Sequence, residues 1–211
     1  MIRILLLLLS VVTVITLGFA AQAQDADFLG KPKALDPKVT SGKYLSNEAT
    51  DEVFKKCKTT YPPRFTPGSL DYYCSCTSVA TQGTLTTAEY ESLQIPRNQI
   101  VGNPVYDKYI TQVIAPCLDT PTLDSEYYYC VLNRKNDPGI RDIVNYCTCV
   151  SEKIAKHVQN YGDADMMSRI DNDLYKDPME AMWRSDGFKQ AKEAAHTQCR
   201  TGNWKSPSVY N

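Results

Sequence analysis

The stretch Tyr73-Cys74-Ser75-Cys76 returns later in the chain as Tyr146-Cys147-Thr148-Cys149, and this repeat decides the fold. In each copy one cysteine precedes the pair, with sixteen residues between, and one lone cysteine follows it. The eight cysteines of the chain thus form two sets: Cys57, Cys74, Cys76 and Cys117, then Cys130, Cys147, Cys149 and Cys199. The spacing predicts a tandem duplication of a four-cysteine unit.

The N-terminus predicts export. Arg3 is followed by an apolar run from Ile4 to Ala20 and by Ala21-Gln22-Ala23, which is typical of a signal peptide, residues 1–23, cleaved before Gln24. An uncleaved membrane anchor is the competing interpretation, because the run is nearly long enough to span a bilayer. The small residues at the cleavage site favour removal. We therefore expect a periplasmic or secreted protein of bacterial type, in which an even number of cysteines predicts disulfides.

Composition narrows the classes of partner. The chain has a net charge of −1 and no basic run, so we expect no binding of nucleic acid. No second apolar stretch approaches membrane-spanning length, so we expect no stable membrane span after signal cleavage. The mature chain is long enough for two small domains, and domains of that size have thin cores that benefit from cross-links.

Helical periodicity dominates after a flexible lead-in, residues 24–47. The first unit, residues 48–118, is expected to contain helices over 47–60 and 69–81, one starting at Thr86, and one from Asn103 to Cys117. The second unit, residues 122–200, is expected to contain helices over 123–135, about 140–160, a short segment marked by Met166, Met167, Ile170 and Leu174, and 185–199. A tail, residues 201–211, follows. The fold class is all-α, with two tandem, duplicated, disulfide-stapled units of about four helices each.

Helix geometry limits the disulfide pairing. Residues two apart on a helix point about 200° apart, so the cysteines of one Cys-x-Cys segment cannot easily bond to each other. Two pairings remain in each unit. In an antiparallel hairpin of two helices, a cysteine a few residues before the loop lies beside a cysteine a few residues after it. This favours Cys57–Cys74 with Cys76–Cys117, and likewise Cys130–Cys147 with Cys149–Cys199. The swapped pairing, Cys57–Cys76 with Cys74–Cys117, stays open.

Metal or redox chemistry is the alternative use of these cysteines. Thiolate pairs can bind copper or zinc or form a reactive dithiol. A fixed framework explains the repeated spacings better, so we expect structural disulfides, no metal site and no cofactor. Of the two histidines, His196 lies three residues before Cys199 and could share a metal with it only if that cysteine were free. The acidic stretch from Asp163 to Asp177 lacks the order of a calcium loop.

Tyrosine runs are the candidate interaction surface. The chain has fourteen tyrosines, and consecutive tyrosines on a helix cannot all face one core. Some must be exposed or face a partner, where tyrosine is enriched, although the rings could also fill thin cores. The candidate surface residues are Tyr72, Tyr73, Tyr127, Tyr128 and Tyr129.

These patterns favour a non-enzymatic role. The sequence contains no nucleophile elbow, phosphate-binding glycine loop, His-Glu-x-x-His or haem motif. We expect an exported helical scaffold that binds another protein in the cell envelope as an assembly, adaptor or inhibitor component. Two alternatives stay open: a periplasmic metal-handling protein that uses the Cys-x-Cys thiolates, and a small carboxylate-based hydrolase. A cleft with two carboxylates, one of them in an apolar pocket, would favour the hydrolase.

Overall fold

The structure is a computed structural model, and it describes residues 43–60, 64–168 and 177–200. The predicted signal peptide (1–23), most of the predicted lead-in (24–47) and the predicted tail (201–211) lie outside these ranges. The described residues form eight α-helices and no β-strand beyond one isolated bridge between Tyr44 and Thr86. The predicted all-α fold class is therefore confirmed for the part of the chain that is described.

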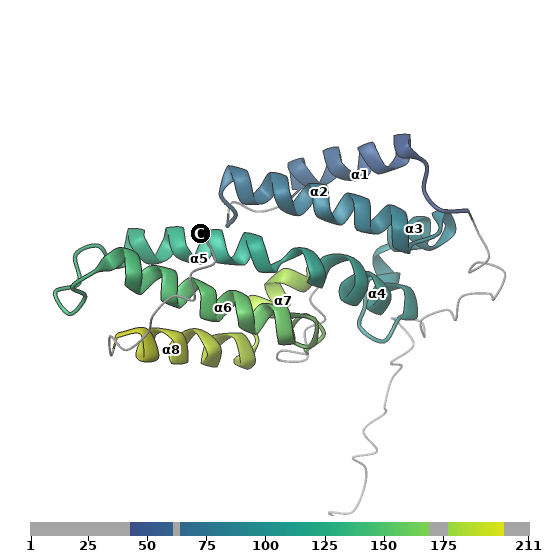
Figure 1. The fold of residues 1–211 in the computed structure, drawn as a ribbon. Coiled ribbons are helices and arrows are strands. Elements are labelled where there is room, and N and C mark those ends of the chain that lie inside the picture. Colours follow the sequence, from purple (N-terminus) through teal and green to yellow (C-terminus); the bar gives the residue numbers. More distant parts are fainter. Residues whose placement is uncertain (1–42, 61–63, 169–176, 201–211) are drawn as a thin grey trace, which may run out of the picture. The chain divides into compact units, whose positions relative to one another are not determined.

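The helices are α1 (Asn47–Thr60), α2 (Pro67–Thr84), α3 (Thr87–Leu93), α4 (Pro104–Tyr109), α5 (Asp119–Arg134), α6 (Ile143–Met166), α7 (Pro178–Arg184) and α8 (Asp186–Arg200). In Figure 1, α1 lies beside α2, and α6 lies between α5 and α8. None of the helices in the described ranges is both long enough and apolar enough to cross a membrane.

The α1–α2 hairpin forms because a helix stop and a helix start lie close together in the sequence. α1 ends at Thr60, shortly before Pro62, and proline disfavours the helical conformation in the residue that precedes it. Thr66 then caps α2 by accepting a hydrogen bond from the amide of Ser69 at 3.2 Å, and Pro67 fits the first turn. α2 therefore begins two residues before the predicted position, Ser69.

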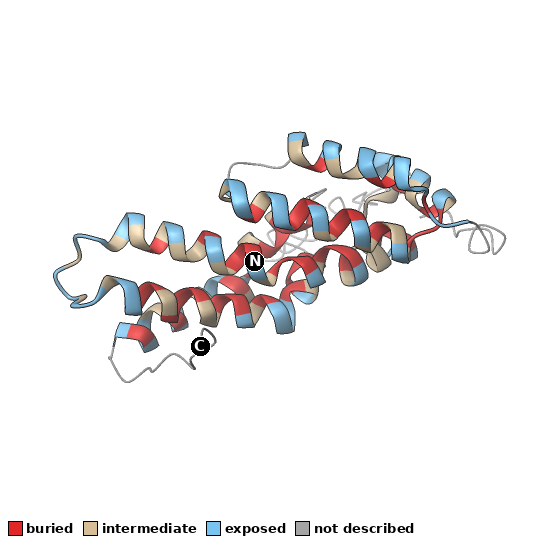
Figure 2. Ribbon diagram, turned by 45° about the horizontal axis from the view of Figure 1, so that its top comes forward, coloured by how far each residue is buried: buried red, intermediate tan, exposed pale blue. Residues whose placement is uncertain are grey.

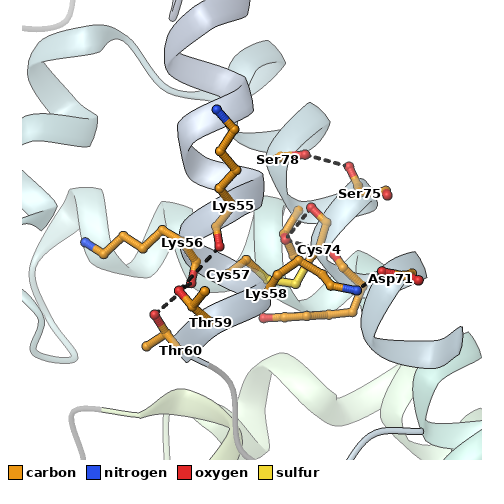
Figure 3. The surroundings of a disulfide bond; sticks show 12 residues. Lys55, Lys56, Cys57, Lys58, Thr59, Thr60, Asp71, Cys74, Ser75 and Ser78 are labelled. Carbon is orange, nitrogen blue, oxygen red and sulfur yellow. Dashed lines mark hydrogen bonds and ion pairs between the residues drawn. A yellow bond between two sulfur atoms is a disulfide. The ribbon is translucent and has the colours of Figure 1, made fainter. Parts of the chain in front are cut away.

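A disulfide fixes this hairpin on its buried side. Cys57 of α1 and Cys74 of α2 are both buried, and their Cα atoms lie 5.6 Å apart. Beside the bridge, Lys58 reaches from α1 to the carboxylate of Asp71 on α2 (Figure 3). Because this ion pair is partly exposed, it contributes little compared with the disulfide.

Each Cys-x-Cys segment is bonded to two different neighbours, as helix geometry requires. The structure contains the first of the two pairings that the sequence allows, and α2 and α6 are each held on two sides. The Cα atoms of the other three bridges lie 5.5–5.8 Å apart. The four bridges are Cys57–Cys74, Cys76–Cys117, Cys130–Cys147 and Cys149–Cys199.

α3 begins with the predicted capping box. The Thr86 side chain accepts a hydrogen bond from the Glu89 amide, and the Glu89 carboxylate accepts one from the Thr86 amide at 2.8 Å. Lys108 of α4 lies 3.1 Å from the same buried carboxylate. Burial alone would raise the pKa of Glu89, but the hydrogen bonds from Thr86 and Lys108 outweigh it and lower that pKa. This carboxylate therefore joins α3 to α4.

The predicted helix from Asn103 to Cys117 starts as expected but is not one regular helix. Asn103 caps α4 by accepting hydrogen bonds from Val105 and Tyr106. After Tyr109 the chain forms a π-helical segment, Ile110–Ile114, and then a 3-10 turn, Ala115–Cys117. Pro116 explains the change, because a proline lacks the amide of the α-helical ladder and its ring collides with the carbonyl four residues earlier.

The second half begins with another hairpin. α5 starts at Asp119, four residues before the predicted position, and places Pro121 in its first turn, where a missing amide costs little. The expected turn at Asp137-Pro138-Gly139 is present, since the Ile140 amide donates to the Asp137 carbonyl at 3.1 Å. α6 starts after Asp142, which caps it, and continues to Met166, beyond the predicted end near residue 160.

The predicted short helix through Met166 is wrong at its start. Met166 is the last residue of α6 and Met167 is its cap, whereas Ile170 and Leu174 lie outside the described residues. A different short helix, α7, follows and was not predicted. Asp177 caps it and Pro178 occupies its first turn, which is the same start signal that Asn103 and Pro104 give for α4. α8 (Asp186–Arg200) matches the last predicted helix closely.

Buried side chains form a continuous core between the helices. Figure 2 shows buried residues along the inner faces of α2 and α6 and exposed residues along their outer faces. Helices of the two predicted units also contact each other, since α2 lies against α5 and Thr66 donates a hydrogen bond to Asp124. The largest fully buried residues are Tyr73, Leu85, Ile110, Ile114, Leu118, Ile154, Met166, Met179 and Met182.

The two bridges of the second half should differ in their contribution to stability. Cys149–Cys199 closes a separation of 50 residues, and Cys130–Cys147 closes one of 17. Because the entropy of loop closure grows with the logarithm of loop length, replacing Cys149 and Cys199 together by alanine should lower the free energy of unfolding by about 1 kcal/mol more than replacing Cys130 and Cys147. Urea unfolding of the two double variants measures the difference, and equal losses would contradict the prediction.

Candidate interaction groove

A cavity of about 340 Å³ opens where the segment before α2 meets α5, α7 and α8. We call it the interaction groove. Its walls combine three aromatic rings with two cations and one carboxylate. The lining residues are Arg64, Phe65, Thr122, Ser125, Glu126, Tyr129, Asn133, Trp183 and Lys192.

The aromatic side of the groove is anchored in the core. Phe65 packs against the buried ring of Tyr73, with 5.3 Å between ring centroids, and against the edge of Trp183 at 6.3 Å. The guanidinium carbon of Arg64 lies 4.3 Å from the centroid of the Trp183 ring, which is a cation–π contact. Trp183 of α7 thus lies between the ring of Phe65, which packs against the core, and the exposed guanidinium of Arg64.

The polar side of the groove carries one paired and one unpaired cation. Lys192 of α8 forms an ion pair with Glu126 of α5 at 2.7 Å. Among the described residues, no carboxylate forms an ion pair with Arg64. The groove therefore has an excess of positive charge, which sits on the exposed face of Trp183.

The tyrosine prediction holds only in part. Tyr129 lines the groove, and the half-exposed Tyr128 packs its ring against Tyr129 at 5.4 Å. Tyr72 is half-exposed on α2, whereas Tyr127 is partly buried against the core. The expectation that Tyr73 belongs to a surface is wrong, because it is fully buried. Successive helical residues point about 100° apart, so the tyrosines of one run cannot all lie on the same side of the helix.

The sequence did not reveal the other groove residues. Arg64 and Phe65 lie in the short connection between α1 and α2, and Trp183 lies on the helix that was not recognised. The available signal was the Asp177-Pro178 helix start, which would have placed Trp183 on a short helix before α8. No periodic pattern could have placed Phe65 beside Trp183, because their contact depends on tertiary packing.

The metal-handling alternative requires free Cys-x-Cys thiolates. All eight cysteines are in disulfides, so none offers a thiolate. His196 is instead hydrogen-bonded through Nδ1 to the hydroxyl of Tyr146 at 2.7 Å, and His157 pairs with Asp165 at 2.7 Å. The described residues contain no group of three or more side chains placed to hold a metal ion.

The hydrolase alternative has two carboxylates in one cavity but not the expected environment. Asp119 and Asp163 both line a cavity of about 390 Å³ beside the π-helical segment. Each carboxylate accepts a hydrogen bond at 2.7 Å from the amide of the next residue. Thr111, Gln159 and Asn160 share the lining, so neither acid sits in the apolar pocket that would favour a proton donor.

His196, beside the groove on α8, should titrate below the usual range. Burial lowers its pKa, and the nearby cations Arg134 and Lys192 lower it further. Because the unfolded chain then binds a proton more readily than the folded chain, stability should be complete above about pH 6.5 and fall as the pH drops toward the lowered pKa.

Two measurements test this expectation. NMR titration of the imidazole should give a pKa below about 6.5. Acidification from neutral pH should also destabilise the natural protein more than the His196→Gln variant. A pKa at or above the usual value would contradict the lowering by burial and by the nearby cations.

Comparison with known proteins gives no assignment: no family model, curated protein or solved structure was found to match this chain. The proposal of a function therefore rests on the geometry of the groove and on the chemistry of the side chains that line it.

Proposed function

We propose that this protein is an exported, non-enzymatic scaffold that binds another protein through the interaction groove. The observation that carries the proposal is the contact of Arg64 with Trp183 at 4.3 Å in the same groove as Tyr129. Tryptophan, tyrosine and arginine are the residues that dominate the energy of protein–protein interfaces, especially when they lie together in one depression.

The disulfide frame supports this proposal by keeping the groove residues in place. α5 carries Tyr129 next to the bridged Cys130, and α8 carries Lys192 on the helix bridged through Cys199. A frame that does not rearrange loses little conformational entropy when a partner binds, so more of the contact energy contributes to affinity.

The charges of the groove favour a partner segment with an acidic residue beside an apolar or aromatic one. Glu126 neutralises Lys192, whereas Arg64 has no carboxylate partner among the described residues. An apolar side chain would fill the space between Tyr129 and Trp183, and an adjacent Asp or Glu of the partner would pair with Arg64. We therefore propose a short acidic and aromatic segment of a protein as the occupant.

The proposed location is the periplasm or the extracellular space. Four disulfides are typical of an oxidising compartment outside the cytosol. The assignment to the periplasm or the extracellular space rests on the apolar N-terminal run and its small-residue cleavage site. These predict a signal peptide over residues 1–23.

We also propose that the fold arose by tandem duplication of a four-cysteine unit. The support is a set of matching features in the two halves. The short bridges both span 17 residues, with Cα atoms 5.6 and 5.5 Å apart, and the long bridges have Cα distances of 5.7 and 5.8 Å. Tyr73 and Tyr146 are both buried before the Cys-x-Cys segment, and Tyr106 and Phe188 are both buried eleven residues before the last cysteine.

Substitutions in the groove should weaken partner binding strongly. A photo-crosslinking residue at Asn133, on the exposed rim, would capture the partner in the cell envelope, and the affinity of the purified pair would then be measured. Trp183→Ala should reduce that affinity by more than about tenfold, as should Arg64→Glu, whose exposed side chain can be changed without disturbing the core.

Tyr161 provides the matched control. It is an exposed aromatic residue on α6 that does not line the groove, so Tyr161→Ala should leave the affinity unchanged. If Arg64→Glu and Trp183→Ala both bound the partner as tightly as the natural protein does, the groove would not be the interface. Equal crosslinking from position 161 would contradict the proposal in the same way.

A further inference from the structure

A second cavity, of about 330 Å³, lies beside Cys57 of the α1–α2 hairpin and shares no lining residue with the interaction groove. It is lined by residues of α1, α2, α3 and α4, of the π-helical segment, and of the start of α7 with its cap Asp177. Its volume is in the range of sites that hold small molecules, which begin at about 300 Å³. Much of its wall is apolar, supplied by Val53, Leu93, Ile114 and Pro178.

One carboxylate lines this cavity without a cation beside it. The Asp177 carboxylate caps α7 by accepting a hydrogen bond from the Met179 amide at 2.9 Å. No Lys, Arg or His among the described residues forms an ion pair with it. Burial, with a further contribution from Glu180, raises the pKa of Asp177. A cation bound beside Asp177 would offset the cost of keeping this carboxylate charged.

Three tyrosines line the same cavity. Tyr90 comes from α3, and Tyr106 and Tyr109 come from α4. Aromatic rings attract cations over their faces, and sites built from several rings with a carboxylate favour ammonium groups that water solvates weakly. The tyrosines and the carboxylate of Asp177 therefore both favour a positively charged ligand.

Lys56 is the only cation among the described residues that line the cavity, and it does not reverse the preference for a positively charged ligand. Lys56 is exposed, and its ammonium group donates a hydrogen bond to Gln94 at 2.7 Å. Its side chain extends away from Cys57 (Figure 3). An anionic ligand could reach Lys56 only at the surface and would be repelled by Asp177 inside the cavity.

We propose that this cavity binds a small organic cation, an ammonium or quaternary ammonium group on a compact apolar body. Asp177 pairs with the charge, the tyrosines surround it, and the apolar wall contacts the remainder of the ligand. The site is separate from the protein-binding groove, so either proposal can fail without the other.

Choline and benzyltrimethylammonium are suitable probes, and 3,3-dimethylbutan-1-ol is the neutral molecule with the shape of choline. Calorimetry and amide NMR would measure their binding to the disulfide-bonded protein. At least one cation should bind saturably at millimolar concentrations, and the neutral alcohol should bind about tenfold more weakly than choline or not at all. The shifted amide signals should belong to α1, α3, α4 and the start of α7 at Asp177.

Two variants locate the site. Asp177→Asn removes the charge but keeps a good helix cap, so the protein should fold normally and bind the cation about tenfold more weakly. Tyr90→Leu should weaken binding while keeping an apolar wall. Asp163→Asn, a carboxylate outside this cavity, and Trp183→Ala, in the groove, are the controls and should leave cation binding unchanged.

Three results would overturn the proposal. The first is the absence of saturable binding for both cations. The second is equal affinity for choline and the neutral alcohol, which would show an apolar pocket without preference for charge. The third is unchanged cation binding in Asp177→Asn, which would show that the cation binds elsewhere.

Discussion

The rest of this structure depends on one constraint: two cysteines separated by one residue on a helix must face different neighbours. α2 and α6 each carry such a pair, so each is fixed on one side to the preceding helix and on the other to a later segment of the chain. A disulfide stabilises chiefly by restricting the unfolded chain, and domains with thin cores gain most from it. All eight cysteines lie in these four bridges, so in this structure they serve to hold the helices together.

The interaction groove and the second cavity lie where segments outside this framework meet it. α7 and its cap contribute to both, with Trp183 in the groove and Pro178 and the capping Asp177 in the second cavity. The connection between α1 and α2 contributes Arg64 and Phe65 to the groove. The disulfides hold the surrounding helices, and both these helices and the short segments between them line the two cavities.

Sequence reasoning succeeded where the signal is local. The capping box at Thr86 and Glu89, the Asn103 cap and the cysteine pairing follow from residue spacing and helix geometry alone. It failed where tertiary packing decides. The full burial of Tyr73, whose ring packs against Phe65, is set by such packing, whereas the change of helix type after Tyr109 had a local signal in Pro116. The groove joins residues more than a hundred positions apart, which no local pattern could bring together.

The most direct test of this account is a map of the disulfides in the exported protein. The protein would be alkylated while unfolded and without reductant, digested unreduced, and analysed by mass spectrometry, with cleavage between the cysteines of each Cys-x-Cys pair by partial acid hydrolysis. The account predicts no free thiol and four links: Cys57–Cys74, Cys76–Cys117, Cys130–Cys147 and Cys149–Cys199. The swapped pairing within either half, or free thiols in a Cys-x-Cys segment, would contradict it.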